Sequence, residues 1–145
     1  AAADDLPLVV LFAKSAADAA RLEAAAADLA WKPEFIGRYV FASAGTAAEL
    51  TAIKGAATKP GLLVIQPGGF GLSGRILAHA DPSATTDQLA EALRQGRKAF
   101  KPRRLQGFDY LRAGHEAGVF WETRLPVTDL HEARARERAR RGARR

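Results

Sequence analysis

The sequence predicts an α/β fold, in which apolar segments of strand length alternate with amphipathic segments of helical length. Leu8–Phe12 is a continuous run of large apolar residues, which is typical of a strand covered on both faces. From Ser15 to Ala30 the apolar residues recur at helical spacing instead. A chain of 145 residues with 48% hydrophobic content is long enough for one domain with a core and too short to expect two.

The first helix is expected to begin after Ser15, whose hydroxyl can accept a hydrogen bond from the first turn, with Asp18 near the positive end of the helix dipole. Pro33 disfavours helical geometry in the residue before it, so this helix should end near residue 30. We expect Trp31 and Phe35 to pack beneath the connection to the next element.

Two strands and a second helix are expected next. Tyr39–Ala42 is the second strand, and Thr46 offers a cap for a helix over Ala47–Ala56. Leu62–Ile65 is the third strand. The chain up to this point therefore alternates between strands and helices.

The third and fourth strands should form an antiparallel hairpin. A glycine-rich loop ends at Gly74, and the fourth strand, Arg75–Ala78, follows it directly. A closing helix, capped within residues 83–86, places Leu89 and Leu93 on one face. The predicted fold is a four-stranded mixed sheet with helices on both faces, followed by a basic C-terminal extension.

This β-α-β-α-β-β-α order resembles the thioredoxin-like superfamily over residues 6–100. Leu8–Phe12 is similar to the central strand that leads to the family's redox motif. Residues 59–62 are similar to its cis-proline segment, and residues 68–74 to the turn between its last two strands. The resemblance implies a cis bond before Pro60, whereas the residues alone leave open an ordinary trans proline that opens a strand.

Ala16 and Ala19 occupy the positions where the resemblance would put the two redox cysteines. A methyl group cannot ionise or form a mixed disulfide, and the chain contains no cysteine. Thiol–disulfide exchange is therefore excluded. The chain looks more like the non-catalytic domains of protein disulfide isomerases, and we expect neither enzymatic activity nor a cofactor.

Other catalytic and metal-binding patterns are weak. His79, His115 and His131 are scattered at spacings that match no helical ligand pair, so no metal site is expected. The glycine-rich loop lacks the Gly-Lys-Ser/Thr ending of a phosphate-binding loop and leads into a strand. Ser15 lacks the flanking glycines of a nucleophile elbow, and a helix cap explains it better.

Positive charge is concentrated at the C-terminal end. The chain carries a net charge of +6, and residues 131–145 contribute +5 of it, from seven arginines and two glutamates. These arginines are Arg134, Arg136, Arg138, Arg140, Arg141, Arg144 and Arg145. A second basic cluster comprises Arg94, Arg97, Lys98, Lys101, Arg103 and Arg104. Both could attract RNA, an anionic surface or an acidic protein, although such ends are also often merely solvated.

Between the two basic clusters lies a segment too apolar for a free linker. Its aromatic residues are Phe108, Tyr110, Phe120 and Trp121. Either they fold back on the core or they dock on another chain. We therefore divide the chain into a thioredoxin-like domain (6–100), an aromatic docking extension (101–130) and an Arg-rich tail (131–145).

The expected function is that of a redox-inactive adaptor, or structural subunit of a larger assembly, that docks on a protein through its C-terminal extension. The alternative is a nucleic-acid-associated, ribosome-linked module that uses the tail. The small residues at the start of the chain, and the lack of Cys and Met, favour an extracytoplasmic (periplasmic or secreted) location after removal of a signal peptide, with an organelle as the alternative. No apolar run is long enough to span a membrane.

Overall fold

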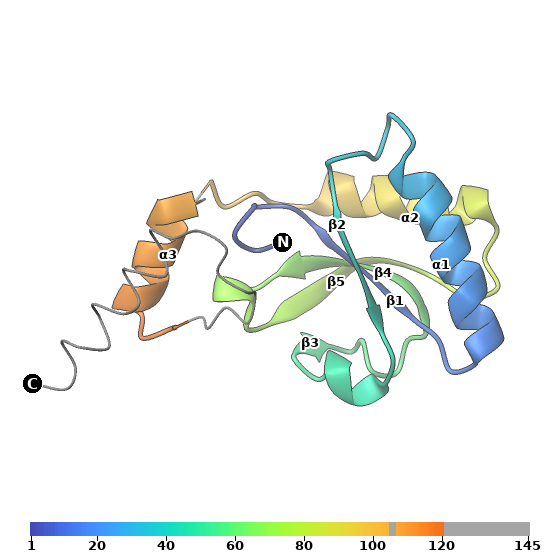
Figure 1. The fold of residues 1–145 in the computed structure, drawn as a ribbon, viewed down its shortest axis with the longest axis horizontal. Coiled ribbons are helices and arrows are strands. Elements are labelled where there is room, and N and C mark those ends of the chain that lie inside the picture. Colours follow the sequence, from blue (N-terminus) through green and yellow to red (C-terminus); the bar gives the residue numbers. More distant parts are fainter. Residues whose placement is uncertain (105–106, 121–145) are drawn as a thin grey trace, which may run out of the picture.

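A computed structural model of the chain describes residues 1–104 and 107–120. They form one mixed β-sheet with two long helices over it, and a third helix at one end (Figure 1). The elements in chain order are β1 (Leu8–Phe12), α1 (Ala16–Ala30), β2 (Val40–Ala44), the 3₁₀ helix η1 (Ala47–Leu50), β3 (Ile53–Lys54), β4 (Gly61–Pro67), the 3₁₀ helix η2 (Gly69–Gly71), β5 (Gly74–Ala80), α2 (Thr86–Ala99) and α3 (Gly107–Glu116).

The sheet has five strands in the order β2-β1-β4-β5-β3. β1 runs parallel to β2 and antiparallel to β4, and β4 and β5 form an antiparallel hairpin. The α/β class and the antiparallel hairpin are therefore confirmed. The expected number of four strands is wrong, because the two-residue strand β3 pairs in parallel with the start of β5.

The segment expected to form the second helix is the source of that extra strand. Ala47–Ala56 forms only the short helix η1 before the chain extends as β3. Leu50 is buried against the sheet, and Gly55 adopts a positive φ of 78° that ends β3 in a turn. Pairing with β5 replaces the helical hydrogen bonds that the local pattern had predicted.

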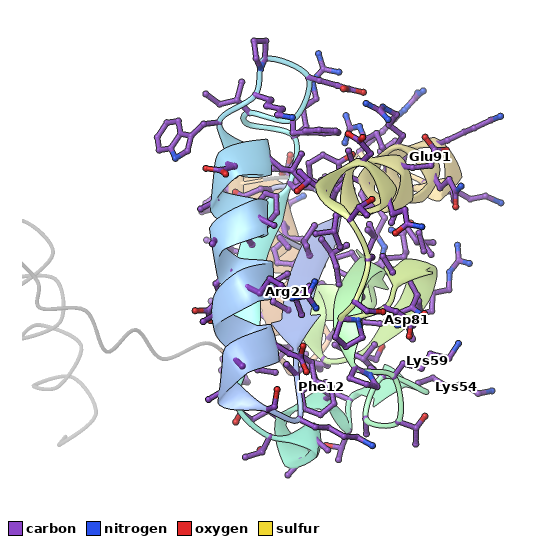
Figure 2. The ribbon with its side chains drawn as sticks, turned by 90° about the vertical axis from the view of Figure 1, so that its right-hand side faces the viewer. Phe12, Arg21, Lys54, Lys59, Asp81 and Glu91 are labelled. Atoms are coloured by element: carbon purple, nitrogen blue, oxygen red, sulfur yellow. The ribbon has the colours of Figure 1, made fainter. Side chains whose placement is uncertain are left out.

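Both long helices, α1 and α2, cover the same face of the sheet, so the expected placement of helices on both faces is wrong. The core on this face is formed mainly by Val9, Leu11, Leu22, Leu29, Leu62, Val64, Leu89 and Leu93. Leu50 and Ala56 cover the opposite face, over Val10, Phe12, Leu63 and Ile65. In Figure 2, Phe12 lies toward the end that holds η1 and β3, and Glu91 projects from α2 at the other end.

The two long helices begin with the side-chain caps that the sequence suggests. Ser15 caps α1 by accepting a hydrogen bond from the backbone N–H of Asp18 at 3.1 Å. Thr85 and Gln88 form a reciprocal capping box at the start of α2. α2 continues to Ala99, six residues beyond Leu93, the last residue named for the predicted helix.

The bond before Pro60 is trans, so the cis bond implied by the resemblance is wrong. The chain turns into β4 at the next residue instead, because Gly61 adopts a φ of +126° that favours glycine. A Cβ at this position would collide with the carbonyl oxygen of Ala80. The carbonyl of Pro60 lies 2.8 Å from Nε2 of His79, which fixes the turn against β5.

Gly96 sets the distance between α2 and the sheet. It is buried in the C-terminal part of α2, and a Cβ there would overlap the side chain of Val64 on β4. Val64 is branched at Cβ and buried, so it cannot move aside cheaply. The absence of a side chain at residue 96 therefore allows the helix to lie close to the central strand.

Gly96→Ala should lower the free energy of unfolding by about 1–3 kcal/mol, as overpacking of a core does, even though alanine favours an isolated helix by about 1 kcal/mol over glycine. Denaturant unfolding of G96A, V64A and the double variant measures the change in the free energy of unfolding that Gly96→Ala causes in each background. Val64→Ala makes room for the new methyl group, so the penalty should shrink in that background. Equal penalties in both backgrounds would contradict the contact.

Candidate functional site

Ala16 and Ala19, where the thioredoxin-like resemblance would put two cysteines, lie in the first turn of α1, after β1. Ala16 is exposed and Ala19 is half-buried. Ser15 caps this turn and donates a hydrogen bond to the Asp18 carboxylate at 2.8 Å. The turn thus presents two methyl groups and a satisfied polar pair, which supply no nucleophile.

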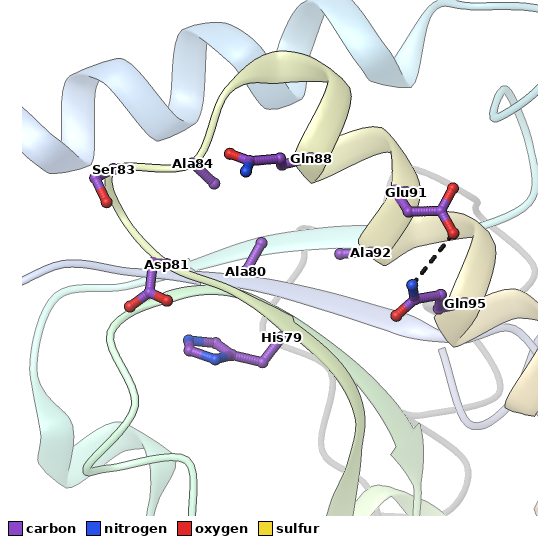
Figure 3. Close-up of a pocket in the computed structure, with 9 residues that line it drawn as sticks. All are labelled: His79, Ala80, Asp81, Ser83, Ala84, Gln88, Glu91, Ala92 and Gln95. Atoms are coloured by element: carbon purple, nitrogen blue, oxygen red, sulfur yellow. Dashed lines mark hydrogen bonds between the residues drawn. The ribbon is translucent and has the colours of Figure 1, made fainter.

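A polar pocket of about 360 Å³ lies between the end of β5 and α2 (Figure 3). Its lining includes His79, Asp81 and Ser83, the residue types of a nucleophilic triad. Among the hydrogen bonds of the described residues, however, none joins these three side chains. His79 contacts the carbonyl of Pro60 instead, and across the pocket Gln95 donates to Glu91 at 3.2 Å. The pocket has the residue types of a catalytic site without its contacts.

A second hollow, of about 370 Å³, lies between α1 and the edge strand β2. Half of its lining residues are alanines, and Leu11 and Phe41 also line it. The Ser43 hydroxyl donates to the Glu23 carboxylate at 2.8 Å along its lining. Both hydrogen-bonding groups here are already paired, so the hollow offers mainly apolar surface.

The C-terminal extension is attached to the sheet by a buried glutamine. Gln66, on β4, accepts a hydrogen bond from the backbone N–H of Lys101 at 2.9 Å and donates one to its carbonyl at 3.2 Å. Asp5 then accepts from the backbone N–H groups of Arg103 and Arg104 at 2.9 and 2.8 Å. We call residues 101–104 the strap. Sequence reasoning missed both anchors, although a polar residue ending an apolar run could have pointed to Gln66.

The strap leads to α3, which lies beside the loop between β4 and β5 (Figure 1). Tyr110 anchors the helix: it is buried, and its ring meets that of Phe70 edge-on with centroids 5.5 Å apart. Burial raises the pKa of the Tyr110 hydroxyl. Tyr110 therefore folds back on the domain, which is one of the two outcomes expected for the aromatic residues.

The other aromatic side chains of α3 face solvent. Phe108 is 77% exposed and Leu111 45% exposed, and with His115 they follow the i, i+3, i+7 spacing of one helix face. Phe120, which is 74% exposed, stacks on His115 with centroids 5.3 Å apart. We call these four residues the α3 stripe. It is the kind of exposed apolar surface that docking on another chain requires.

Half of the second basic cluster is engaged within the molecule. The guanidinium of Arg94 donates to both carboxylate oxygens of Glu34, at 2.6 and 3.0 Å, and this contact holds the pKa of Glu34 below its usual range. Arg103 donates to the carbonyl of Pro67 at 3.0 Å. Arg97 lies over the ring of Phe100. Three of the six cations of this cluster thus contact other groups of the protein. Fewer of its side chains are therefore available to bind the phosphates of a nucleic acid.

Trp121 and the arginines of residues 131–145 lie outside the residues that the structure describes. Of the two aromatic residues expected beneath the α1–β2 connection, Phe35 is buried and Trp31 is 77% exposed. The expectation for Trp31 is therefore wrong, because Phe35 alone fills the space under the connection.

No cluster of three or more potential metal ligands occurs within residues 1–104 and 107–120. No helix in the same part of the chain is long and apolar enough to cross a membrane. Comparisons with protein families, with curated proteins and with solved structures return no match to this chain. The function must therefore be argued from the surfaces described above.

Asp5→Ala should release the strap, because the carboxylate holds two of its backbone N–H groups. Trypsin cleavage after Arg103 or Arg104 should accelerate about tenfold, since hydrogen bonds to a charged group contribute about 1.5–3 kcal/mol. Mass spectrometry of limited digests identifies the cut. Asp28→Ala is the control, because it removes an exposed carboxylate from α1 that makes neither of the two Asp5 hydrogen bonds. Equal cleavage of the two variants would contradict the role of Asp5.

Proposed function

We propose that this protein is a redox-inactive, thioredoxin-like adaptor that docks on a protein partner through its C-terminal extension. The α3 stripe carries the proposal. It consists of one exposed face of α3, a helix that packs on Phe70 through Tyr110, and of Phe120, which stacks on His115. Because this face is ordered before binding, docking would cost little conformational entropy.

The order of elements supports the thioredoxin-like part of the proposal. A parallel pair, β1 and β2, is joined by α1, and an antiparallel hairpin, β4 and β5, is followed by α2. Ala16 and Ala19 then fall in the turn where that family carries its cysteines. The chain departs from the expected pattern at Pro60, which is trans, and in the segment 47–56, which lacks a long helix.

The docking part of the proposal is supported by the chemistry of the stripe. Phenylalanine side chains that become fully desolvated contribute strongly to protein interfaces, whereas a solvated helix face normally carries polar residues. Arg112, between Leu111 and the end of the helix, lies 3.9 Å from Asp109 and 3.8 Å from Glu116. These pairs place charge beside the apolar stripe, as in the polar rim of an interface.

Cysteines introduced together at Ala16 and Ala19 should form a disulfide, and the thiol at 16 should have a lowered pKa because it lies at the helix N-terminus. The pH dependence of alkylation and the mass of the oxidised protein measure both. A pair at Ala24 and Ala27 has the same spacing in the helix interior and should show an ordinary thiol pKa. Failure of the first pair to oxidise would contradict the thioredoxin-like alignment.

Phe108→Ser and Phe120→Ser should each abolish co-purification of the partner from cells that make the protein. Truncating a central aromatic anchor costs about 2 kcal/mol or more of binding free energy. Trp31→Ser is the matched control, because it removes an equally exposed aromatic residue from the α1–β2 connection. Equal recovery of the partner by all three variants would contradict docking through the α3 stripe.

RNA binding by the purified protein tests the alternative, a nucleic-acid-associated module that uses the Arg-rich tail. RNA affinity is measured at two salt concentrations for the full chain and for a chain that ends at residue 130. An adaptor should bind RNA weakly in both forms. Affinity that falls steeply with salt, and whose salt dependence is lost with residues 131–145, would favour the nucleic-acid-associated module instead.

A further inference from the structure

A second exposed apolar feature lies on the turn that joins α1 to β2. Trp31 is 77% exposed and Ile36 is 50% exposed, and both lie on this short connection. We call residues 31–38 the 31–38 turn. It protrudes from the body of the molecule, beyond the end of α1 (Figure 1). The turn is separate in sequence from the α3 stripe and plays no part in the proposed docking.

The 31–38 turn is held firmly despite its exposed side chains. The backbone N–H groups of Phe35 and Ile36 both donate to the carbonyl of Lys32, at 2.9 and 3.0 Å. Phe35 is buried and meets the ring of Tyr39 edge-on, at 6.1 Å. The hydroxyl of Tyr39 in turn donates to the carbonyl of Leu93 on α2, at 2.9 Å. Trp31 and Ile36 are thus presented to water by a fixed backbone.

The turn carries two cations, Lys32 and Arg38, and one carboxylate, which pairs with Arg94 of α2. Arg94 also lies 3.4 Å from Glu91. Glu34 is its only acidic residue, and Arg94 satisfies both carboxylate oxygens. Lys32 and Arg38 lie close enough to contribute to the lowering of the Glu34 pKa, after the larger effect of Arg94. With Glu34 neutralised by Arg94, the charges of Lys32 and Arg38 are left to act on a partner. A ligand for this turn should therefore be apolar in one layer and anionic in another.

We propose that the 31–38 turn is a contact site for an anionic phospholipid surface, with Trp31 and Ile36 entering the headgroup region and Lys32 and Arg38 facing the phosphates. Tryptophan is favoured at membrane–water interfaces, and adjacent cations are attracted to acidic lipids. Such a contact is peripheral and needs no spanning helix.

The shape and composition of the turn favour lipid over RNA. An RNA site would use flat side chains on which successive bases stack. Ile36 has no aromatic face, and the turn projects outward instead of forming a groove that could follow a strand. A fluid lipid interface accepts a small protruding apolar wedge without a complementary pocket.

Vesicle binding alone cannot test the proposal, because any basic part of a chain of net charge +6 could be attracted to acidic vesicles. The experiment therefore measures whether Trp31 itself enters the lipid, from its fluorescence. The chain has two tryptophans, so Trp121→Phe leaves Trp31 as the sole indole reporter. Vesicles of phosphatidylcholine with phosphatidylserine should shift its emission to the blue, and brominated lipids should quench it. Vesicles of phosphatidylcholine alone should have little effect.

Further substitutions in the Trp121→Phe variant measure how much each side chain of the turn contributes to vesicle binding. Lys32→Ala and Arg38→Ala should each weaken vesicle affinity about fivefold, corresponding to about 1 kcal/mol per cation near an acidic membrane. Ile36→Ser should reduce quenching. Arg75→Ala removes an exposed cation from β5, and Leu72→Ser removes an exposed apolar side chain from the loop before β5. Neither substitution should change Trp31 emission on vesicles.

Vesicle binding without a blue shift or quenching of Trp31 would overturn the proposal, since another part of the chain would then be making the contact. Stronger quenching by RNA than by acidic vesicles would overturn it in favour of a nucleic-acid surface. Failure here leaves adaptor docking intact, because the α3 stripe is assayed separately by co-purification of its partner.

Discussion

The complete burial of β4 is the constraint on which the rest of the structure depends. All seven of its residues, Gly61–Pro67, are shielded from solvent. Its apolar side chains alternate between the core under α1 and α2 and the core under η1. Continuing that alternation to Gln66 places an amide group where water cannot solvate it, so it must find hydrogen bonds in the protein. The backbone of Lys101 supplies them, and the strap is thereby fixed beside the sheet.

The local sequence pattern was sufficient to predict a helix or strand where residues within that element determine its structure. The apolar runs at 8–12 and 62–65 predict β1 and β4 directly, and Ser15 predicts the start of α1. The segment 47–56 contains nothing that forbids a helix. It forms β3 because Ile53 and Lys54 pair with β5, a contact between segments that the local pattern does not reveal. In place of a long helix, Leu50 of η1 and Ala56 cover that face of the sheet.

The same limit applies to the candidate site. Phe108 and Tyr110 are two residues apart, so a helix must point them in different directions, but helical spacing alone does not say which one is buried. Phe70, on a distant loop, settles this by packing against Tyr110. The role of Asp5 could not be predicted from local sequence either, because its partners are 98 and 99 residues away along the chain. The composition of the extension predicted that aromatic residues would matter there, and the tertiary contacts decided which of them remain exposed.

The α3 stripe and the 31–38 turn share one physical design. Each presents large apolar side chains to water beside a buried aromatic residue that fixes the backbone: Tyr110 against Phe70 in the first case, and Phe35 against Tyr39 in the second. A flexible segment could reduce its apolar exposure by collapsing onto the domain. In these two segments the buried aromatic contacts hold the backbone in a position that leaves the neighbouring large apolar side chains exposed to water. This exposure of large apolar side chains to water is the physical reason for proposing that both surfaces bind a partner.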